Sequence, residues 1–238
     1  MENTTLERLN ALNRDFYDTF ARAFADSRGP TEPGLARVLE GIAPGDRVLD
    51  LGCGNGRLAL LLPAGCTYTG ADFSAEMLAV ARAHVAAEGR AAHFIHVDLM
   101  QPDWPAAFPQ RYDGIIMRAV LHHLPGMAHR QRVLSQAATL LQPGGALIIA
   151  NWQFMAVARL RERVQPWAEI GLTTADVEPG DYLLDWRREG RGLRYVHLVD
   201  EAETHALAQA AGLTVAALFR ADGREGNLTL YAVLRRTR

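Results

Sequence analysis

The segment from Val48 to Gly56 constrains the fold of this chain more than any other stretch. Its apolar residues and one acid, Asp50, run directly into three alternate glycines at positions 52, 54 and 56. A short apolar run of this kind predicts a buried strand, and the glycines predict a tight turn because glycine adopts positive φ angles without steric cost. The turn also allows a ligand to approach the main chain closely.

Strands and helices are predicted to alternate through the middle of the chain. The predicted strands are 47–51, 67–71, 93–97, 113–118 and 145–150, and the predicted helices between them are 56–62, 74–88 (with Ser74 as its N-cap) and 127–142. This alternation predicts an α/β fold with a doubly wound, mostly parallel sheet and helices on both faces. Two further strands at about 213–219 and 227–234 bring the expected sheet to seven strands. Ligands bind such sheets at the carboxyl ends of the strands.

The 238 residues are expected to form one domain with four parts. Residues 1–45, with helices at 5–26 and 33–41, are predicted to form an N-terminal helical part that precedes the core at 46–150. Residues 151–198 interrupt the alternation and are predicted to form a substrate-side insertion that is helical at first and then irregular. Residues 199–238 are predicted to close the chain with a helix at about 200–211 and a pair of strands.

The composition limits the classes of protein to which the chain can belong. The formal charge of −2 argues against a strongly basic surface, although all 25 basic residues are arginines, which suit the recognition of planar anions. No apolar run approaches the ~18 residues of a membrane span, so no membrane association is expected. Two cysteines, Cys53 and Cys66, do not make a disulfide framework, so reduced thiols and a cytoplasmic location are expected.

Acids that follow the second and third predicted strands indicate a nucleoside ligand. Asp72 lies 22 residues after Asp50, and an acid at about this distance beyond a glycine-rich turn is placed to accept hydrogen bonds from ribose hydroxyls. Asp98 is expected to accept from an adenine amino group, with Phe73 or Leu99 packed on the ring. The sequence therefore predicts an adenosine-containing cofactor, with the backbone amides of the glycine turn facing a carboxylate of that cofactor.

The spacing of the glycines separates two cofactor classes. The third glycine falls one place short of the dinucleotide fingerprint G-x-G-x-x-G. The pattern Asp50-x-Gly52-x-Gly54-x-Gly56 instead resembles the first motif of class I S-adenosylmethionine methyltransferases. The resemblance implies S-adenosyl-L-methionine as the cofactor and S-adenosyl-L-homocysteine as its product.

Two adjacent histidines follow the fourth predicted strand. His122 and His123 lack the spacing of zinc ligands, and His93 and His96 are expected to point to opposite faces of a strand, so no metal site is predicted. We expect His122 or His123 to line the mouth of the cofactor pocket. The inserted segments 181–188 and 194–197 mix aromatic rings with arginines, a combination that stacks a base and clamps an anion.

Several segments together resemble one family, the tRNA wobble-uridine carboxymethyl methyltransferases, which esterify 5-carboxymethyluridine. The segments that carry the resemblance are 16–28, 48–56, 119–124, 182–186, 194–197 and 226–228. The resemblance implies a Rossmann-like methyltransferase fold, an N-terminal segment that covers the cofactor, and tRNA as the partner. With the acids above, the expected cofactor residues are Tyr17, Arg28, Asp50, Gly52, Cys53, Gly54, Asn55, Gly56, Asp72, Phe73, Met77, Asp98, Leu99, Arg118 and Ala119.

Three hypotheses for the function follow from the sequence. In the first, the acceptor is a carboxylate that needs no general base, and Arg118, Arg194 and His197 anchor it. In the second, a small-molecule O- or N-methyltransferase uses the insertion as a lid and His122 or His123 as its base. In the third, the chain binds S-adenosylmethionine as a partner protein without catalysis. The residues predicted to contact the acceptor are Tyr182 and Trp186 as a stacking wall, with Arg187 and Tyr195 beside them.

Overall fold

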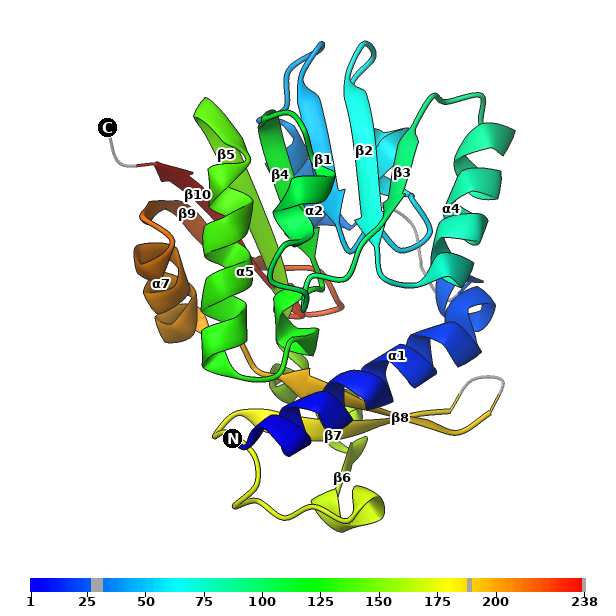
Figure 1. Ribbon diagram of the computed structural model, residues 1–238, viewed down its shortest axis with the longest axis vertical. Coiled ribbons are helices and arrows are strands. Elements are labelled where there is room, and N and C mark those ends of the chain that lie inside the picture. The colour runs from blue at the N-terminus through cyan, green and yellow to red at the C-terminus, as the bar shows by residue number, and fades with distance from the viewer. Residues whose placement is uncertain (27–31, 188–189, 237–238) are drawn as a thin grey trace.

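A computed structural model describes residues 1–26, 32–187 and 190–236, and Figure 1 shows their arrangement. The helices are α1 (Asn3–Asp26), α2 (Pro33–Leu39), α3 (Leu58–Leu61), α4 (Ala75–Ala87), α5 (Met127–Thr139), α6 (Ala158–Arg161) and α7 (Glu201–Ala210). The strands are β1 (Arg47–Leu51), β2 (Thr67–Asp72), β3 (His93–His96), β4 (Tyr112–Arg118), β5 (Leu141–Trp152), β6 (Val164–Gln165), β7 (Asp181–Trp186), β8 (Gly192–His197), β9 (Leu213–Ala221) and β10 (Thr229–Arg236). Single 3₁₀ turns are η1 (Trp104–Ala107), η2 (Leu121–His123), η3 (Phe154–Ala156) and η4 (Trp167–Ile170). Within these described ranges, none of the helices has both the length and the apolar character needed to cross a membrane.

The main sheet has seven strands in the order β3-β2-β1-β4-β5-β10-β9. Neighbouring strands from β1 to β5 pair in parallel, whereas β10 runs antiparallel to both β5 and β9. The predicted α/β fold with a mostly parallel seven-stranded sheet is therefore confirmed. The strand order changes direction between β1 and β4, and open sheets of this kind bind ligands beyond the carboxyl ends of their strands at that point.

Both faces of the main sheet are covered by apolar cores. On one face, α2, α3 and α4 pack around Val48 and Ile116, whose exposed fractions are 0% and 1%. On the other face, α5 and α7 pack around Leu49, Ile115 and Met117, which are fully buried. Alternate residues of β1 and β4 therefore belong to different cores, which explains why these strands read as nearly continuous apolar runs.

The insertion after β5 contains a second sheet that the sequence does not predict. Strands β6, β7 and β8 form a three-stranded antiparallel sheet within the segment expected to be irregular. That expectation is wrong because β7 is buried along almost its whole length, so it lacks the polar alternation of a half-exposed strand. Two of its buried residues are acids, Asp181 and Asp185, which makes the segment look like a surface loop.

Helix α1 lies across the carboxyl edge of the main sheet, between that edge and the small sheet (Figure 1). It packs against β8 and against α4. The helix is kinked at Phe20, where the backbone has φ of −109° and ψ of 18°. This placement puts one face of α1 over the edge at which a ligand is expected to bind.

Ser74 begins α4 and also connects it to α1. Its hydroxyl accepts the N-cap hydrogen bond from the Met77 amide at 3.2 Å and donates to Asp18 Oδ1 at 2.7 Å. We expect Ser74→Ala to lower the free energy of unfolding by about 1 kcal/mol, because the loss of an N-cap typically costs that much. Urea titration measures the change. Ser74→Thr retains the hydroxyl and is the control, and an equal loss in both variants would show that the cap does not stabilise the helix.

Candidate active site

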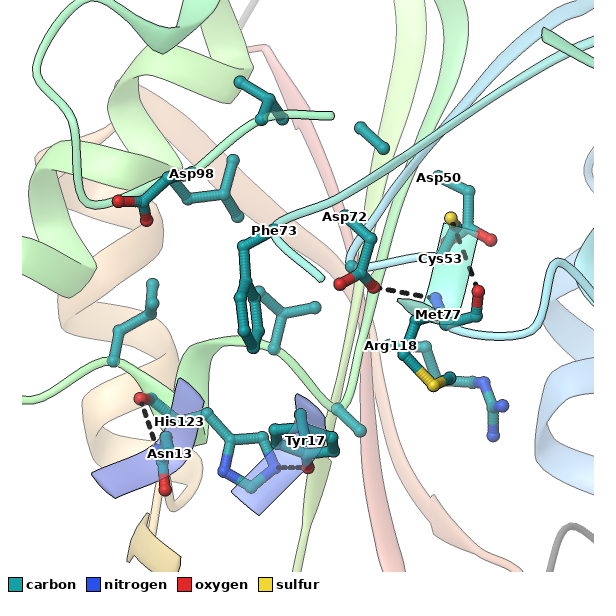
Figure 2. A pocket seen from close by; sticks show the side chains of 18 of the residues that line it. Asn13, Tyr17, Asp50, Cys53, Asp72, Phe73, Met77, Asp98, Arg118 and His123 are labelled. Carbon is teal, nitrogen blue, oxygen red and sulfur yellow. Dashed lines mark hydrogen bonds between the residues drawn. The ribbon is translucent and has the colours of Figure 1, made fainter. Parts of the chain in front are cut away.

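A pocket lies at the carboxyl ends of β1, β2 and β4, between the sheet and α1 (Figure 2). The predicted cofactor residues that line it are Tyr17, Asp50, Gly52, Cys53, Gly54, Asn55, Asp72, Phe73, Met77, Asp98, Leu99, Arg118 and Ala119. Further lining residues, not predicted, are Asn10, Asn13, Arg14, Leu35, Arg57, Leu58, Ala71, Val97, Met100, Ile116, Val120 and Leu124. Of the remaining predicted cofactor residues, Gly56 does not line the pocket, and Arg28 lies outside the described residues.

The turn after β1 requires glycine for two different reasons. Gly52 has φ of +72°, and a Cβ there would lie 2.4 Å from Cγ2 of Val120, which lines the pocket. Gly56 has φ of +70°, and a Cβ there would lie 3.1 Å from both Val85 and Phe94. Gly52 therefore keeps the turn close to the pocket wall. Gly56 faces the core instead, which corrects its predicted contact with the cofactor.

The amides of the turn have acceptors within the protein. Those of Gly52 and Cys53 donate to the Ala71 carbonyl at 2.7 and 3.0 Å. The Gly54 amide donates to Oδ2 of Asp72 at 2.9 Å. These bonds occupy three of the Gly52–Gly56 amides that the sequence predicts to face a cofactor carboxylate. They fix the turn to the end of β2.

Asp72 is held in one orientation at the end of β2. Its Oδ1 accepts from the Ser74 amide at 3.0 Å, and its Oδ2 accepts from the Gly54 amide. Burial, only partly offset by these amides, raises the pKa of Asp72. Each carboxylate oxygen has two lone pairs, so both oxygens retain capacity to accept from a pair of hydroxyls. The geometry is thus compatible with the predicted contact to a ribose.

The end of the pocket near β1 presents both signs of charge. Arg57 and Arg118 both bind Oε2 of Glu32, at 3.3 and 2.6 Å. Asp50 feels the charge of Arg118, is 4% exposed, and accepts from the Tyr68 hydroxyl at 2.8 Å. A zwitterionic amino-acid group would find guanidinium groups for its carboxylate here and carboxylates for its ammonium.

Asp50 is expected to make the stability of the protein depend on pH. Burial raises the pKa of Asp50 to about 7, against the opposing effects of the Tyr68 hydrogen bond and the Arg118 charge. An unfolded aspartate has a pKa of about 4, so between that value and about 7 the native state holds a proton that the unfolded state has released. The contribution of Asp50 to the free energy of unfolding therefore falls as the pH rises through this window.

The variant Asp50→Asn removes this titration, and Tyr68 can still donate to the amide oxygen. At pH 8 we expect the free energy of unfolding of this variant to be about 2 kcal/mol higher than that of the unmodified protein. At pH 4 we expect the two values to differ little. Urea titrations at the two pH values, without ligand, measure the difference. If the free energies of unfolding of the two proteins differed by the same amount at pH 4 and pH 8, the titration would not belong to Asp50.

The other end of the pocket is lined by Asp98 and Phe73 (Figure 2). Asp98 forms an ion pair with Arg14 of α1 and accepts from the Met100 amide at 2.9 Å. The rings of Phe73 and Tyr17 meet edge-on, with centroids 6.1 Å apart. Helix α1 therefore supplies polar and aromatic groups to the pocket. Apolar periodicity in a sequence identifies the buried face of a helix but not the polar residues that line a pocket. Most of these residues of α1 were therefore not predicted.

Of the two adjacent histidines, His123 lines the pocket and His122 does not. His122 is 1% exposed, and its Nδ1 accepts from the Trp152 amide at 3.3 Å. Nε2 of His123 lies 2.7 Å from the Tyr17 hydroxyl. Successive side chains of a 3₁₀ turn point about 120° apart, so the two rings enter different surroundings. His122, predicted as a catalytic residue, therefore lies outside the pocket, and His123 is the histidine of the pair that lines it.

His123 lies where α1, η2 and β8 meet. Its Nδ1 is 3.2 Å from the carbonyl oxygen of Tyr195. Asn13 of α1 donates to the His123 carbonyl at 3.1 Å and accepts from the Tyr195 amide at 2.8 Å. These bonds connect the small sheet to the pocket through main-chain groups, which no sequence motif could indicate.

Arg194 lies behind the pocket wall rather than in it. It is 4% exposed. Its guanidinium lies over the rings of Phe16, Trp152 and Trp186, at 5.2, 5.0 and 5.7 Å from their centroids. Burial lowers the pKa of Arg194, and a hydrogen bond with Tyr17 acts in the opposite direction. Arg194 and Trp186 thus form an enclosed cluster behind Tyr17, which corrects their predicted direct contact with an acceptor.

The other residues predicted to contact the acceptor also lie outside the pocket. Tyr182 packs edge-on against Phe154, with ring centroids 5.3 Å apart. Arg187, which follows β7, pairs with Asp185 of that strand at 2.5 Å. Tyr195 is fully buried. These placements correct the prediction that the insertion clamps an acceptor directly.

His197 belongs to a buried cluster of charges between the small sheet and helices α5 and α7. Its Nδ1 lies 2.6 Å from Asp181, and its Nε2 lies 2.7 Å from Glu203. Burial alone would lower the pKa of His197, but the hydrogen bonds to these carboxylates raise it above its usual value. Arg130, 1% exposed, donates to Glu178 and Glu203 at 3.1 and 2.6 Å. Both imidazole nitrogens are thus engaged within the protein, which corrects the prediction that His197 anchors an acceptor.

The same cluster has the spacing of a metal site but already contains a cation. Ligand atoms of Glu178, Asp181 and His197 lie within 4.8 Å of one another. The Arg130 guanidinium lies among them, 3.1 Å from Glu178 and 3.2 Å from Nε2 of His197. We therefore interpret the cluster as an ion-pair network that joins β7 and β8 to the core.

Comparison with known proteins shows that the chain is similar to methyltransferases. Residues 48–145 match a family model described as a methyltransferase domain. The ubiquinone biosynthesis O-methyltransferase of Thiobacillus denitrificans is 30% identical over 170 residues, covering 71% of this chain and 65% of that protein. The tRNA (carboxymethyluridine(34)-5-O)-methyltransferase of Arabidopsis thaliana is 29% identical over 136 residues, covering 57% of this chain and 31% of that protein. The chain thus spans less than two thirds of the length of these two curated relatives.

The fold is also shared with proteins of known structure. The magnesium protoporphyrin IX methyltransferase of Synechocystis PCC 6803, solved with bound S-adenosylhomocysteine, superimposes with a TM-score of 0.63 at 20% sequence identity. The superposition covers 96% of this chain and 99% of that one. At this level of identity the likeness establishes a common fold.

Proposed function

We propose that this chain, which carries a methyltransferase domain at residues 48–145, transfers a methyl group from S-adenosylmethionine to an acceptor in the pocket. The observation that carries the proposal is the position of Asp72, whose carboxylate is fixed to the glycine turn at the carboxyl edge of the sheet. The bound S-adenosylhomocysteine in the Synechocystis methyltransferase supports the same class of ligand here.

The pocket residues match the separate parts of this cofactor. Asp72 is suited to accept from the two ribose hydroxyls, and Asp98 to accept from the adenine amino group. Phe73 provides an apolar surface for the base. Arg118 and Asp50, at the other end, are suited to bind the carboxylate and the ammonium of the amino-acid group. This assignment uses side chains where the sequence predicts main-chain amides.

For methyl transfer the protein mainly has to position the acceptor relative to the cofactor. S-adenosylmethionine supplies a methyl group on a sulfonium, which is already an activated leaving group. The pocket then has to hold the acceptor in line with the bond that breaks and to exclude competing water, and well-oriented reactants gain up to several orders of magnitude in rate. An acceptor that carries a proton also needs a base.

We propose a small-molecule acceptor in preference to tRNA. The segments 182–186 and 194–197, which suggest RNA contacts from the sequence, form largely buried strands whose aromatic rings pack inside the protein. The O-methyltransferase relative from Thiobacillus supports this acceptor class. The relative from Arabidopsis supports a carboxymethylated wobble uridine in tRNA, which is the second candidate.

Two measurements test the proposal. Calorimetry with S-adenosylhomocysteine tests whether the pocket binds the cofactor. Labelled methyl transfer from S-adenosylmethionine into total tRNA, compared with a metabolite extract, identifies the acceptor class by mass analysis of the product. Label in the extract supports the small-molecule proposal, label in tRNA replaces it with the second candidate, and binding without any label indicates a non-catalytic binding protein.

The cytoplasm is the proposed location. Cys53 is a buried free thiol and Cys66 a partly exposed one, as a reducing compartment allows. To test this, the protein is purified without reductant and then unfolded. We expect a thiol reagent to modify Cys53 and Cys66 equally.

A further inference from the structure

A tyrosine and a histidine form a hydrogen-bonded pair in the pocket wall. Figure 2 shows the Tyr17 hydroxyl facing the His123 ring, at 2.7 Å from Nε2. Both residues line the pocket, Tyr17 from α1 and His123 from η2. A hydroxyl in contact with a ring nitrogen can exchange a proton with it, so the direction of this hydrogen bond decides what the pair can do.

The surroundings of His123 set that direction. Its Nδ1 lies 3.2 Å from the Tyr195 carbonyl oxygen, which can only accept a hydrogen bond. Nδ1 therefore carries the proton of the neutral ring, and Nε2 presents a lone pair. It follows that Tyr17 donates its proton to Nε2. Asn13 maintains the arrangement by bonding the main chain of both His123 and Tyr195.

A buried cation stands behind the tyrosine. The Arg194 guanidinium shares a hydrogen bond with the Tyr17 side chain and, because it has only donors, must donate to the Tyr17 oxygen. Arg194 is enclosed by three aromatic rings, so its charge is little screened by water. A positive charge in this position stabilises negative charge on the Tyr17 oxygen, which makes Tyr17 a better donor to Nε2 of His123.

We propose that Tyr17 is the general base for a hydroxyl acceptor, with His123 as the positioning residue that receives the proton of Tyr17. This inference rests on the proposed function. As the acceptor oxygen forms its bond to the methyl carbon, the acceptor proton passes to the Tyr17 oxygen and the proton of Tyr17 passes to Nε2 of His123. The carbon–sulfur bond breaks with its electron pair on sulfur, so the products are a methyl ether, S-adenosylhomocysteine and a protonated His123.

The nearby cation makes the proposal specific for a hydroxyl. Arg194 favours an acceptor oxygen that becomes negative as its proton leaves. A neutral amine attacks through its own lone pair and develops no negative charge that Arg194 could stabilise. A carboxylate acceptor is already ionised and would not use the pair at all.

The decisive variants are Tyr17→Phe and His123→Gln, with Tyr112→Phe, a buried tyrosine at the start of β4, as the matched control. The acceptor probes are catechol, whose hydroxyl is protonated at neutral pH, and 4-nitrocatechol, which is largely ionised under the same conditions. With catechol, we expect kcat to fall at least about 100-fold in both variants while KM changes little. With 4-nitrocatechol the fall is expected to be much smaller, because no base is needed.

Two readouts keep this test separate from that of the proposed function. Calorimetry is expected to show S-adenosylhomocysteine bound by both variants within about threefold of the unmodified protein. ¹⁵N NMR of the histidines in that complex is expected to show His123 protonated at Nδ1. If the unmodified protein does not bind S-adenosylhomocysteine, the proposed function itself is wrong.

Three other results overturn the base assignment alone. The first is a His123 ring protonated at Nε2. The second is an equal loss of activity on both phenols or a loss of cofactor affinity in Tyr17→Phe, which would make Tyr17 a binding residue. The third is that the protein methylates neither catechol nor 4-nitrocatechol and that the labelled product from the metabolite extract is an ester or a methylated amine.

Discussion

Asp72→Ala is expected to lower the affinity for S-adenosylmethionine at least about 100-fold, a loss of about 2.7 kcal/mol. In the proposed mode two ribose hydroxyls donate to this carboxylate, and a hydrogen bond to a charged group contributes about 1.5–3 kcal/mol. The variant also releases the amides of Gly54 and Ser74, which now donate to Asp72 at 2.9 and 3.0 Å. The turn then has to reorganise before it binds a ligand, which adds to the loss.

Calorimetry with S-adenosylhomocysteine measures the affinity of this variant. The matched control is Asp113→Ala, because Asp113 pairs with Arg47 at the opposite end of β1 and lies outside the pocket. Circular dichroism checks that both variants fold. Undiminished affinity in Asp72→Ala would show that the ribose is bound elsewhere, and the same loss in both variants would show that the effect is not local.

The strands of the core and the turn after β1 were predictable from sequence because they depend on local residues. A strand buried on both faces must be apolar throughout, as in β1 and β4, and three alternate glycines permit few structures other than a tight turn. The acid at the end of β2 follows from the same logic, since the fold brings every carboxyl end of a parallel strand to one edge.

The insertion was not predictable because its order comes from buried polar contacts. Asp181 and His197 look like surface residues in the sequence, yet they pair at 2.6 Å inside the protein. Arg194 and Trp186 look like a surface that binds an anion or a base, yet they pack against Phe16 of α1. Burial of such side chains depends on partners distant in sequence, and residue type alone assigns them to solvent.

The choice between His122 and His123 shows a different limit. Both are histidines in one short turn, so composition and spacing treat them alike. Their roles separate only through the Trp152 amide that bonds one ring and the Tyr195 carbonyl that bonds the other. Main-chain partners leave no trace in the sequence, which is why a proton acceptor can be expected in this turn but not assigned to a residue.

Because the Tyr195 carbonyl orients His123, whatever holds β8 in place also supports the site. Arg130 of α5 is the centre of that support, as it binds Glu178 and Glu203 and donates to the Leu124 carbonyl at 3.0 Å. We expect Arg130→Met to lower the free energy of unfolding by about 3–5 kcal/mol, because it leaves two carboxylates near buried Asp181 without their cation. Urea titration at neutral pH measures the loss.

Two further variants separate the buried charge from the general loss of an arginine. Arg220→Met breaks an exposed pair with Glu201, at 3.3 Å, and is expected to cost at most about 1 kcal/mol. Adding Glu178→Gln and Glu203→Gln to Arg130→Met is expected to recover part of the stability, since the uncompensated charges are then removed. If Arg130→Met is as stable as the unmodified protein, the network does not hold the small sheet, and the orientation of His123 must depend on Asn13 and α1 alone.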